Sequence, residues 1–431
     1  MFASTTTATT ATPEEPAAGG TATITQEIFN LVKGIVGAGV LTLPAGIAAF
    51  GNAPSAVLPA VALIALIGSL SGYGFGLIGR VCALTKTQSY RQAWSATVSE
   101  ESSWIPAWSV TLKTCFAVLA YSMILGDTFQ ALLATAGVTH VGKPLVLGSL
   151  TTLVLLPLCL LKNLSSLAPF SLLGSLGMVY TAVAMAIRYF GKAYVGKGAL
   201  ALDLPVQLRP SFGTVGAAGV CQPSAAILVG MLSTAYMAHF NAPKFYTELK
   251  DATVPRYLQV VSTSFAISIA LFAGMASLGF LTFGAHSSGL ILNNYSTKDT
   301  LMGVSRIAVA LSLVFSYPLA FVGAREGLLD LLQVKNRSPR VLNSLTVGLL
   351  AAITGAALVI PDVSFVLALA GSTLGNCLIY IFPFFMFRGA IRQLKQPTKL
   401  QKAEVKVAGV SAVLGLVMGV LGAAKAIQSV L

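Results

Sequence analysis

The stretch Asn30-Leu-Val-Lys-Gly-Ile-Val-Gly-Ala-Gly-Val-Leu-Thr-Leu-Pro44 decides the fold of this chain. It lies in an apolar run, residues 26–50, which is long enough to cross a bilayer as a helix. Glycine costs about 1 kcal/mol per helix position relative to alanine, and proline removes a backbone donor. Gly34, Gly37 and Gly39 therefore favour either an interrupted helix or close packing against a neighbour through small residues.

A second apolar run, residues 218–245, carries a similar disturbance near its centre. Asn241 and Pro243 are poor residues for a helix interior, and His239 is polar at membrane depth. The two disturbed runs are the first and sixth along the chain, so each begins a group of five. Unusual segments at matching places in two halves of a transporter indicate its binding site.

The composition indicates an integral membrane protein. Of the 431 residues, 55% are hydrophobic and 10% are charged, and the mean hydropathy is +0.81; a soluble domain carries about 25% charged residues. We count about eleven apolar runs long enough to span a bilayer. They are 26–50, 55–79, 106–136, 144–161, 166–190, 218–245, 256–283, 300–331, 340–360, 363–387 and 405–426.

The expected organisation is a transmembrane domain over residues 25–426 between two short tails. Residues 1–24 have the composition of a disordered cytoplasmic tail, and 427–431 form a short C-terminal tail. Within the domain, repeat one covers about 26–190, repeat two about 218–387, and an extra helix about 405–426. If the N-terminus is cytoplasmic, inner loops hold sixteen Lys and Arg residues and outer loops hold five, as the positive-inside rule requires.

A broken helix presents free backbone groups that suit an α-amino acid. N–H groups are free where one half begins, and C=O groups are free where the other half ends. We therefore expect the N–H groups near residues 37–39 to bind the substrate carboxylate and the carbonyls near residues 234–236 to bind its ammonium group. The predicted substrate-binding residues are Gly37, Ala38, Gly39, Val40, Thr234, Ala235, Tyr236 and His239.

Several segments resemble the amino acid/auxin permease family of the amino acid–polyamine–organocation superfamily. The first run resembles proton-coupled and vacuolar amino acid transporters, and residues 239–250 resemble sodium-coupled neutral amino acid transporters. The resemblance covers about residues 26–390, and no single motif is specific. The other matching segments are Ala120-Tyr-Ser-Met-Ile-Leu-Gly-Asp127, residues 161–172, Phe315-Ser-Tyr-Pro318 with Arg325-Glu326, and Pro361-Asp-Val-Ser364 with Gly371-Ser-Thr-Leu-Gly375.

The resemblance implies an all-α, LeuT-like fold of five-plus-five inverted repeats, with helices one and six interrupted and an eleventh helix added. It implies secondary active transport of amino acids with protons or sodium across a plasma, vacuolar or lysosomal membrane. Sodium-coupled members have an asparagine as a sodium ligand where Lys33 stands, and a hydroxyl residue that corresponds to Ser316. A lysine ammonium at a cation site disfavours sodium, so we expect proton coupling or cation-independent transport, with proton coupling preferred.

The residues predicted to act in coupling or gating are Lys33, Ser316, Glu248 and Asp127. Lys33 lies inside an apolar run, where a charge is costly; it is either a proton-sensitive group or a side chain that reaches the headgroups. His239 is either a packing residue or a pH sensor. Ser316 either relieves the backbone before Pro318 or contacts a ligand. Glu248 is either a structural contact or a gating group, and Asp127 is either a helix-end contact or a proton carrier.

Other function classes are disfavoured by what the sequence lacks. The five cysteines and three histidines form no metal-ligand or catalytic pattern, so we expect no metal, no cofactor and no enzymatic activity. The net charge of +13 is spread between apolar runs, which argues against nucleic acid as a partner. Two alternatives remain: an amino-acid sensor built on a transporter fold, and a sodium-coupled neutral amino acid transporter.

Overall fold

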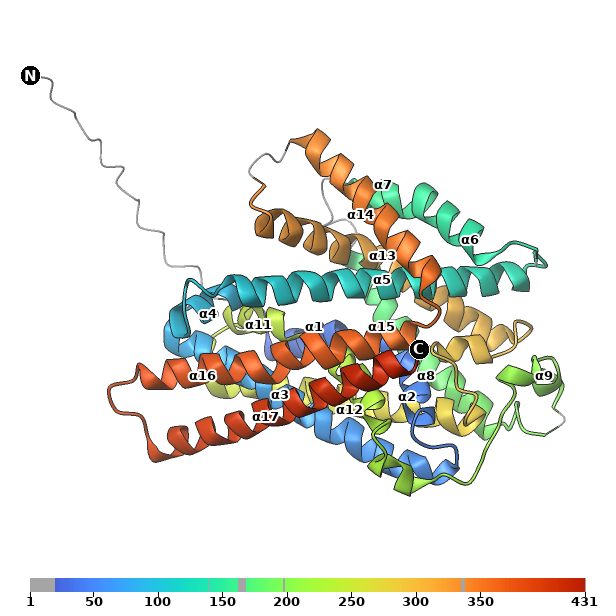
Figure 1. Cartoon of the computed structure of the whole chain (residues 1–431), viewed down its shortest axis with the longest axis horizontal. Helices are drawn as coiled ribbons and strands as arrows, with labels where there is room; N and C mark the ends of the chain where they lie inside the picture. Colours follow the sequence, from blue (N-terminus) through green and yellow to red (C-terminus); the bar gives the residue numbers. More distant parts are fainter. Residues whose placement is uncertain (1–19, 139, 162–167, 197, 335–337, 431) are drawn as a thin grey trace, which may run out of the picture.

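The computed structural model describes residues 20–138, 140–161, 168–196, 198–334 and 338–430. In these residues the secondary structure is helical, apart from two isolated β-bridges. Figure 1 shows most of the long helices running along the long axis of the molecule. Most of the predicted N-terminal tail, and the turn at Lys162 and Asn163, lie outside the described residues.

The first five spans alternate in direction along the chain. They are α1 (Ile24–Ile35) with η1 (Ala38–Thr42) and α2 (Leu43–Ala48), then α3 (Val57–Thr85), α5 (Trp104–Thr135), α6 (Lys143–Leu150) with η3 (Thr151–Leu155) and α7 (Leu156–Cys159), and α8 (Ala168–Phe190). The short helix α4 (Tyr90–Thr97) joins α3 to α5, and α9 (Ala199–Leu202) follows α8.

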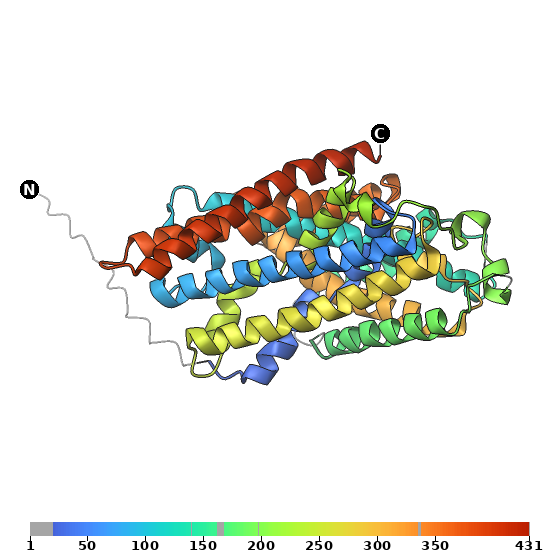
Figure 2. The same cartoon turned by 90° about the horizontal axis from the view of Figure 1, so that it is seen from below.

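The second half repeats this arrangement and adds one helix. It consists of α10 (Ala225–Ala235) with η7 (His239–Asn241) and α11 (Ala242–Glu248), then α12 (Val254–Phe283), α13 (Thr300–Leu331), α14 (Pro339–Val359), and α15 (Val363–Ala370) continued by η9 (Gly371–Gly375), η10 (Cys377–Ile381) and α16 (Phe382–Arg392). The last helix, α17 (Lys399–Gln428), lies on the outside of the bundle in Figure 2.

The helices account for the eleven predicted spans. Eight helices in the described residues are long and apolar enough to cross a membrane, and the bent pair α1 and α2 adds a ninth. Two shorter apolar helices, Lys143–Cys159 and Leu176–Phe190, occupy the places of the fourth and fifth spans. The sixth helix begins at Ala225 rather than 218, because Ala217–Cys221 forms a separate 3-10 turn and Pro223 follows it.

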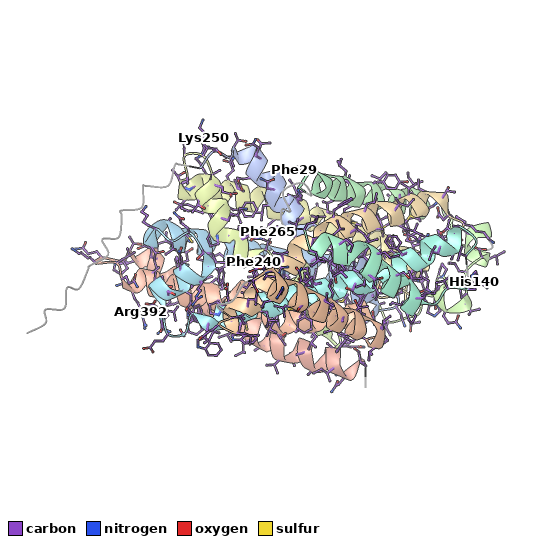
Figure 3. All side chains as sticks on the ribbon, turned by 90° about the horizontal axis from the view of Figure 1, so that it is seen from above. Phe29, His140, Phe240, Lys250, Phe265 and Arg392 are labelled. Carbon is purple, nitrogen blue, oxygen red and sulfur yellow. The ribbon has the colours of Figure 1, made fainter. Side chains whose placement is uncertain are left out.

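The two ends of the bundle differ in their residues. Figure 3 shows Lys250 and Arg392 at one end, here called the Arg392 end, and His140 at the opposite end, the His140 end. At the Arg392 end α3, α16 and α17 extend beyond the predicted apolar runs into polar turns. There Arg80 forms an ion pair with Glu404, which ties α3 to α17.

The His140 end is closed by buried polar contacts between α8, α13 and the loops beside them. The carboxylate of Asp299 accepts hydrogen bonds from Arg188 Nε at 2.9 Å and Nη2 at 2.7 Å and from Tyr194 Oη at 2.9 Å. Burial raises the pKa of the Tyr194 hydroxyl well above its usual value, so this group stays a donor. The buried guanidinium of Arg306 donates to the carbonyls of Leu292 and Tyr295.

The residues Asn294-Tyr295-Ser296 have the Asn-x-Ser pattern of a glycosylation acceptor, and they lie within this closed end. The side chain of Asn294 is fully buried, its Nδ2 donates to the carbonyl of His286 at 2.7 Å, and its Oδ1 accepts from the N–H of Ser288 at 2.8 Å. The side chain of Ser296 is also buried. The side chain of Asn294 therefore holds residues of the loop between α12 and α13 together.

Candidate substrate-binding site

The first helix is interrupted where the glycines predicted a disturbance. Helix α1 ends at Ile35, Val36 and Gly37 are extended, and the chain resumes as the 3-10 segment η1 and then α2. The two helical parts are bent by 42° relative to each other. The first N–H groups of a helix have no acceptor within it, so the segment that begins at Ala38 offers free donors at the break.

The surroundings of the glycines decide between an open break and close packing. A Cβ atom added to Gly34, Gly37 or Gly39 would meet nothing within 4 Å. By contrast, a Cβ on Gly46, seven residues after Gly39, would lie 2.8 Å from a side-chain carbon of Leu228. The three glycines at the break therefore border empty space, whereas Gly46 allows α2 to pack closely against α10.

The sixth helix is also interrupted near its centre. Helix α10 ends at Ala235, where the N–H of Tyr236 bonds to the carbonyl of Leu232 at 2.9 Å. The 3-10 turn η7 then leads into α11, which begins with Ala242 and Pro243. Because Pro243 has no N–H and Asn241 precedes it, regular α-helical hydrogen bonding cannot run through this segment.

A cavity of about 100 Å³ lies between these two interruptions. Both backbone segments contribute to its wall, and α5 and α15 complete it. The lining residues are Gly34, Ile35, Gly37, Ala38, Gly39, Val40, Lys113, Phe116, Ala117, Ala120, Tyr121, Ile124, Thr234, Ala235, Met237, Leu367 and Ala370. The wall is thus mostly apolar side chains and bare backbone, with Lys113 as its charged group.

Six of the eight predicted substrate-binding residues line this cavity, and two do not. The six are Gly37, Ala38, Gly39, Val40, Thr234 and Ala235. Tyr236 is fully buried and donates from its hydroxyl to the carbonyl of Ile64 at 3.2 Å, which directs the ring towards α3. His239 is also fully buried, and its Nε2 lies 2.8 Å from the carbonyl oxygen of Ser71 on the same helix.

The predicted coupling and gating residues do not line the cavity. Lys33 and Ser316 are half-buried on α1 and α13. Glu248 lies at the Arg392 end and pairs with Lys244 at 3.6 Å, with half of its side chain exposed. Asp127 lies near the His140 end of α5, where its carboxylate is 2.6 Å from Lys143 Nζ.

Lys113 lines the cavity, although it was not predicted from the sequence. Its Nζ lies 4.7 Å from the centre of the Phe240 ring, a cation–π contact between α5 and η7. It forms no ion pair within the described residues. Phe240 lines a second hollow towards the Arg392 end, together with Tyr90 and Asp330. The pair Lys113–Phe240 therefore separates the central cavity from that hollow.

The remaining missed wall residues come from α5 and α15. Their signal in the sequence was weak, because Phe116, Ala117 and Leu367 resemble any lipid-facing or core residue of an apolar run. Lys113 had a stronger signal as a lone cation nine residues after Trp104, well inside the third apolar run.

Comparison with known proteins gives a family for the whole chain. The model of the family described as transmembrane amino acid transporter protein matches residues 20–428. Amino acid transporter AVT6E of Arabidopsis thaliana is 26% identical over 414 residues, covering 92% of this chain and 81% of the relative. Putative sodium-coupled neutral amino acid transporter 11 of Rattus norvegicus is 24% identical, covering 85% of this chain and 77% of the relative.

Solved structures with the same fold include two of Mhp1. The inward-facing conformation of Mhp1 superposes with a TM-score of 0.61 at 12% identity, over 95% of this chain and 90% of that one. A closed conformation with bromovinylhydantoin bound gives a TM-score of 0.55 at 11% identity, over 94% and 91% of the two chains. These likenesses confirm the predicted LeuT-like, all-helical fold. Together with the family match over nearly its full length, they establish that this multi-pass membrane protein belongs to the transmembrane amino acid transporter family, whose members are transporters rather than enzymes.

Proposed function

We propose that this chain is a secondary active transporter of zwitterionic amino acids, driven by protons, that works by alternating access. The substrate binds in the central cavity between the interruptions of helix one (α1 and α2) and helix six (α10 and α11). Backbone N–H groups of residues 37–39 hold its carboxylate, and carbonyls of residues 234–236 hold its ammonium group.

The observation that carries this proposal is the empty space beside Gly34, Gly37 and Gly39. A side chain at these positions would cover the backbone, whereas glycine leaves it accessible from the cavity. The N–H groups at the start of η1 then favour an anion through their partial positive charge. The wall offers few side-chain hydroxyls, and Thr234 already donates its hydroxyl to the carbonyl of Leu367 at 2.6 Å. Recognition by backbone suits the part that all α-amino acids share.

Protons are favoured over sodium as the driving ion by Lys33. This lysine stands where sodium-coupled members have a sodium ligand, and its ammonium would repel a bound sodium ion. The relatives named as sodium-coupled are about a quarter identical to this chain, which leaves room for a different ion.

The Arg392 end faces the cytoplasm in this proposal. Arg80, Lys250 and Arg392 belong to the loops with the larger share of basic residues, which membranes retain on the cytoplasmic side. The membrane is the plasma membrane or that of a vacuole or lysosome. Accessibility of tags at either end of helix α17 in intact and permeabilised cells tests the orientation, and their location identifies the membrane.

Uptake by proteoliposomes tests the function and the driving ion together. Each of the twenty amino acids is offered in radioactive form under an imposed proton gradient, an imposed sodium gradient, or neither. The proposal expects accumulation of several neutral amino acids that an inward proton gradient increases and a sodium gradient does not. Binding of an amino acid without flux would indicate a sensor instead, and stimulation by sodium alone would refute proton coupling.

A further inference from the structure

At the Arg392 end, Ala22, which lies just before α1, pairs with residues 248–250 at the end of α11. This contact is here called the joint, and a buried carboxylate, that of Glu27, lies close to it. Glu27 is in the first turn of α1, and its side chain is 1% exposed. Both of its carboxylate oxygens are buried without a hydrogen-bond partner. Among the described residues, each of the other carboxylates either makes a hydrogen bond or ion pair or reaches solvent.

Glu27 forms no ion pair with the groups around it in the described part of the chain. On α11 the nearest charges are Glu248, a second carboxylate, and Lys244, which pairs with Glu248 at 3.6 Å. On α12 the neighbouring ionisable group is the buried Tyr257, whose hydroxyl already donates to the carbonyl of Phe75 at 3.0 Å. Arg256 precedes Tyr257, but its Nε is also buried without a partner, and it forms no ion pair in the described part of the chain.

The backbone fixes this joint firmly. The N–H of Ala22 bonds to the carbonyl of Glu248 at 2.9 Å, and the N–H of Lys250 bonds to the carbonyl of Ala22 at 2.8 Å. A Cβ on Gly20 would lie 2.3 Å from the Glu248 carbonyl, so only glycine allows this approach. Figure 3 places Phe29 of α1 and Lys250 along the same edge of the molecule, with Lys250 nearer the Arg392 end. The segment before α1 and the end of α11 therefore form one unit.

We propose that Glu27 is the proton-binding site of this transporter, a step that rests on the proton-coupled function proposed above. An ionised carboxylate buried without a partner costs several kcal/mol, whereas the neutral acid costs far less. In the conformation described here, with α1 packed on α12, Glu27 holds a proton. When the joined α1 and α11 swing away from α12, water reaches the carboxyl group and the proton leaves. A metal cation is a poorer occupant, because hard cations need about six oxygen ligands and this joint offers two carboxylates.

Transport by Glu27→Gln distinguishes coupling from folding. Glutamine keeps the shape and the neutral state but cannot release a proton. Exchange of internal for external amino acid, which requires no net proton movement, should persist at a rate within a few fold of the wild type. The ratio of net uptake with an inward proton gradient to net uptake without one should fall to about one. The matched control is Glu101→Gln, an exposed carboxylate in the turn between α4 and α5, which should keep the wild-type stimulation.

The outcomes separate this inference from the proposed function. If wild-type uptake does not respond to protons, proton coupling is refuted and the assignment of Glu27 falls with it. If the wild type responds and Glu27→Gln responds equally, the assignment alone is wrong. If Glu27→Gln does not transport at all, infrared spectroscopy of the reconstituted protein still tests the assignment. The band of a protonated carboxylic acid should be present in the wild type, absent in Glu27→Gln and shifted in Glu27→Asp; a band that none of these changes alters would overturn the proposal.

Discussion

The lone ammonium in the cavity wall sets an expectation for substrate choice. Lys113 lines the central cavity and forms no ion pair within the described residues. Its charge therefore acts on whatever the cavity holds. A substrate with a cationic side chain would place a second positive charge in the same small space, so we expect wild-type protein to discriminate against lysine and arginine.

The size of this effect follows from Coulomb's law. Two unit charges about 7 Å apart repel by about 2 kcal/mol at an effective dielectric constant of about 20. That energy corresponds to about a 30-fold difference in affinity. Lys113→Met removes the charge and keeps an unbranched side chain, so the ratio of lysine to norleucine affinity should rise by about 30-fold. These two amino acids differ by the terminal ammonium group, which makes their ratio a direct measure of the repulsion.

Competition against uptake of a labelled neutral substrate supplies the measurement. Lysine and norleucine are titrated as inhibitors for the wild type, Lys113→Met and Lys113→Arg. The arginine variant keeps the positive charge and should select like the wild type. Equal lysine-to-norleucine ratios in all three proteins would refute the reasoning, because the ammonium would then lie outside the range in which it influences a bound side chain.

Three further predictions concern the His140 end. Asn294 should carry no glycan in eukaryotic cells, because its buried amide is already hydrogen-bonded; treatment with a glycosidase that removes N-linked glycans should leave the electrophoretic mobility unchanged. Arg188→Met leaves the fully buried Asp299 without its cation, which should lower the free energy of unfolding by about 3 kcal/mol. The apparent melting temperature in detergent should fall, and adding Asp299→Asn should restore part of the loss. Hydrogen bonds from Lys298 and Ser296 hold the pKa of Asp203 below its usual 3.8. The ionised carboxylate therefore stabilises the fold above that pH, and this stabilisation is lost as the pH falls through the lowered pKa. Asp203→Asn should reduce the fall of the melting temperature on acidification.

The architecture could be predicted from the sequence because lipid imposes a simple local rule. Each crossing needs a run of about 20 apolar residues, and polar turns separate such runs. The interruptions were predictable for a similar reason, since glycine, asparagine and proline weaken a helix wherever they stand. Sequence could not decide whether Gly37 and Gly39 border a cavity or a neighbouring helix. That choice depends on what lies opposite, which is set by helices distant in the chain.

Side-chain direction at the interruptions was beyond sequence reasoning. Tyr236 and His239 were grouped with Thr234 and Ala235 by their position at the predicted break, yet their side chains contact α3 instead of the cavity. A regular helix repeats every 3.6 residues, but this phase is lost where the helix stops and a 3-10 turn begins. Neighbours along the chain can therefore face opposite sides.

Glu27 shows a different limit. An acidic residue in the first turn of a helix normally interacts favourably with the helix dipole at the surface, and its sequence context gave no other indication. Its proposed role depends on burial, and α1 is covered here by α12, which lies more than two hundred residues away in the sequence. The structure was needed to show that this carboxylate has no partner.

The contacts on either side of the cavity connect these observations into a mechanism of movement. At the Arg392 end, backbone bonds between Ala22 and the end of α11 join the α1 half of helix one to the α11 half of helix six. On the other side of the interruptions, α2 packs on α10 so closely that a Cβ on Gly46 would overlap Leu228. Each half of helix one is thus held to the matching half of helix six. The two pairs are connected by the extended residues Val36 and Gly37 and by the segment from Tyr236 to Ala238. We expect rotation at these residues to move one pair relative to the other. A cavity placed between the two pairs should open to one side when either pair tilts. A disulfide or cross-link that joins α1 to α12 prevents this tilt, so it should stop transport while leaving binding of the amino acid intact.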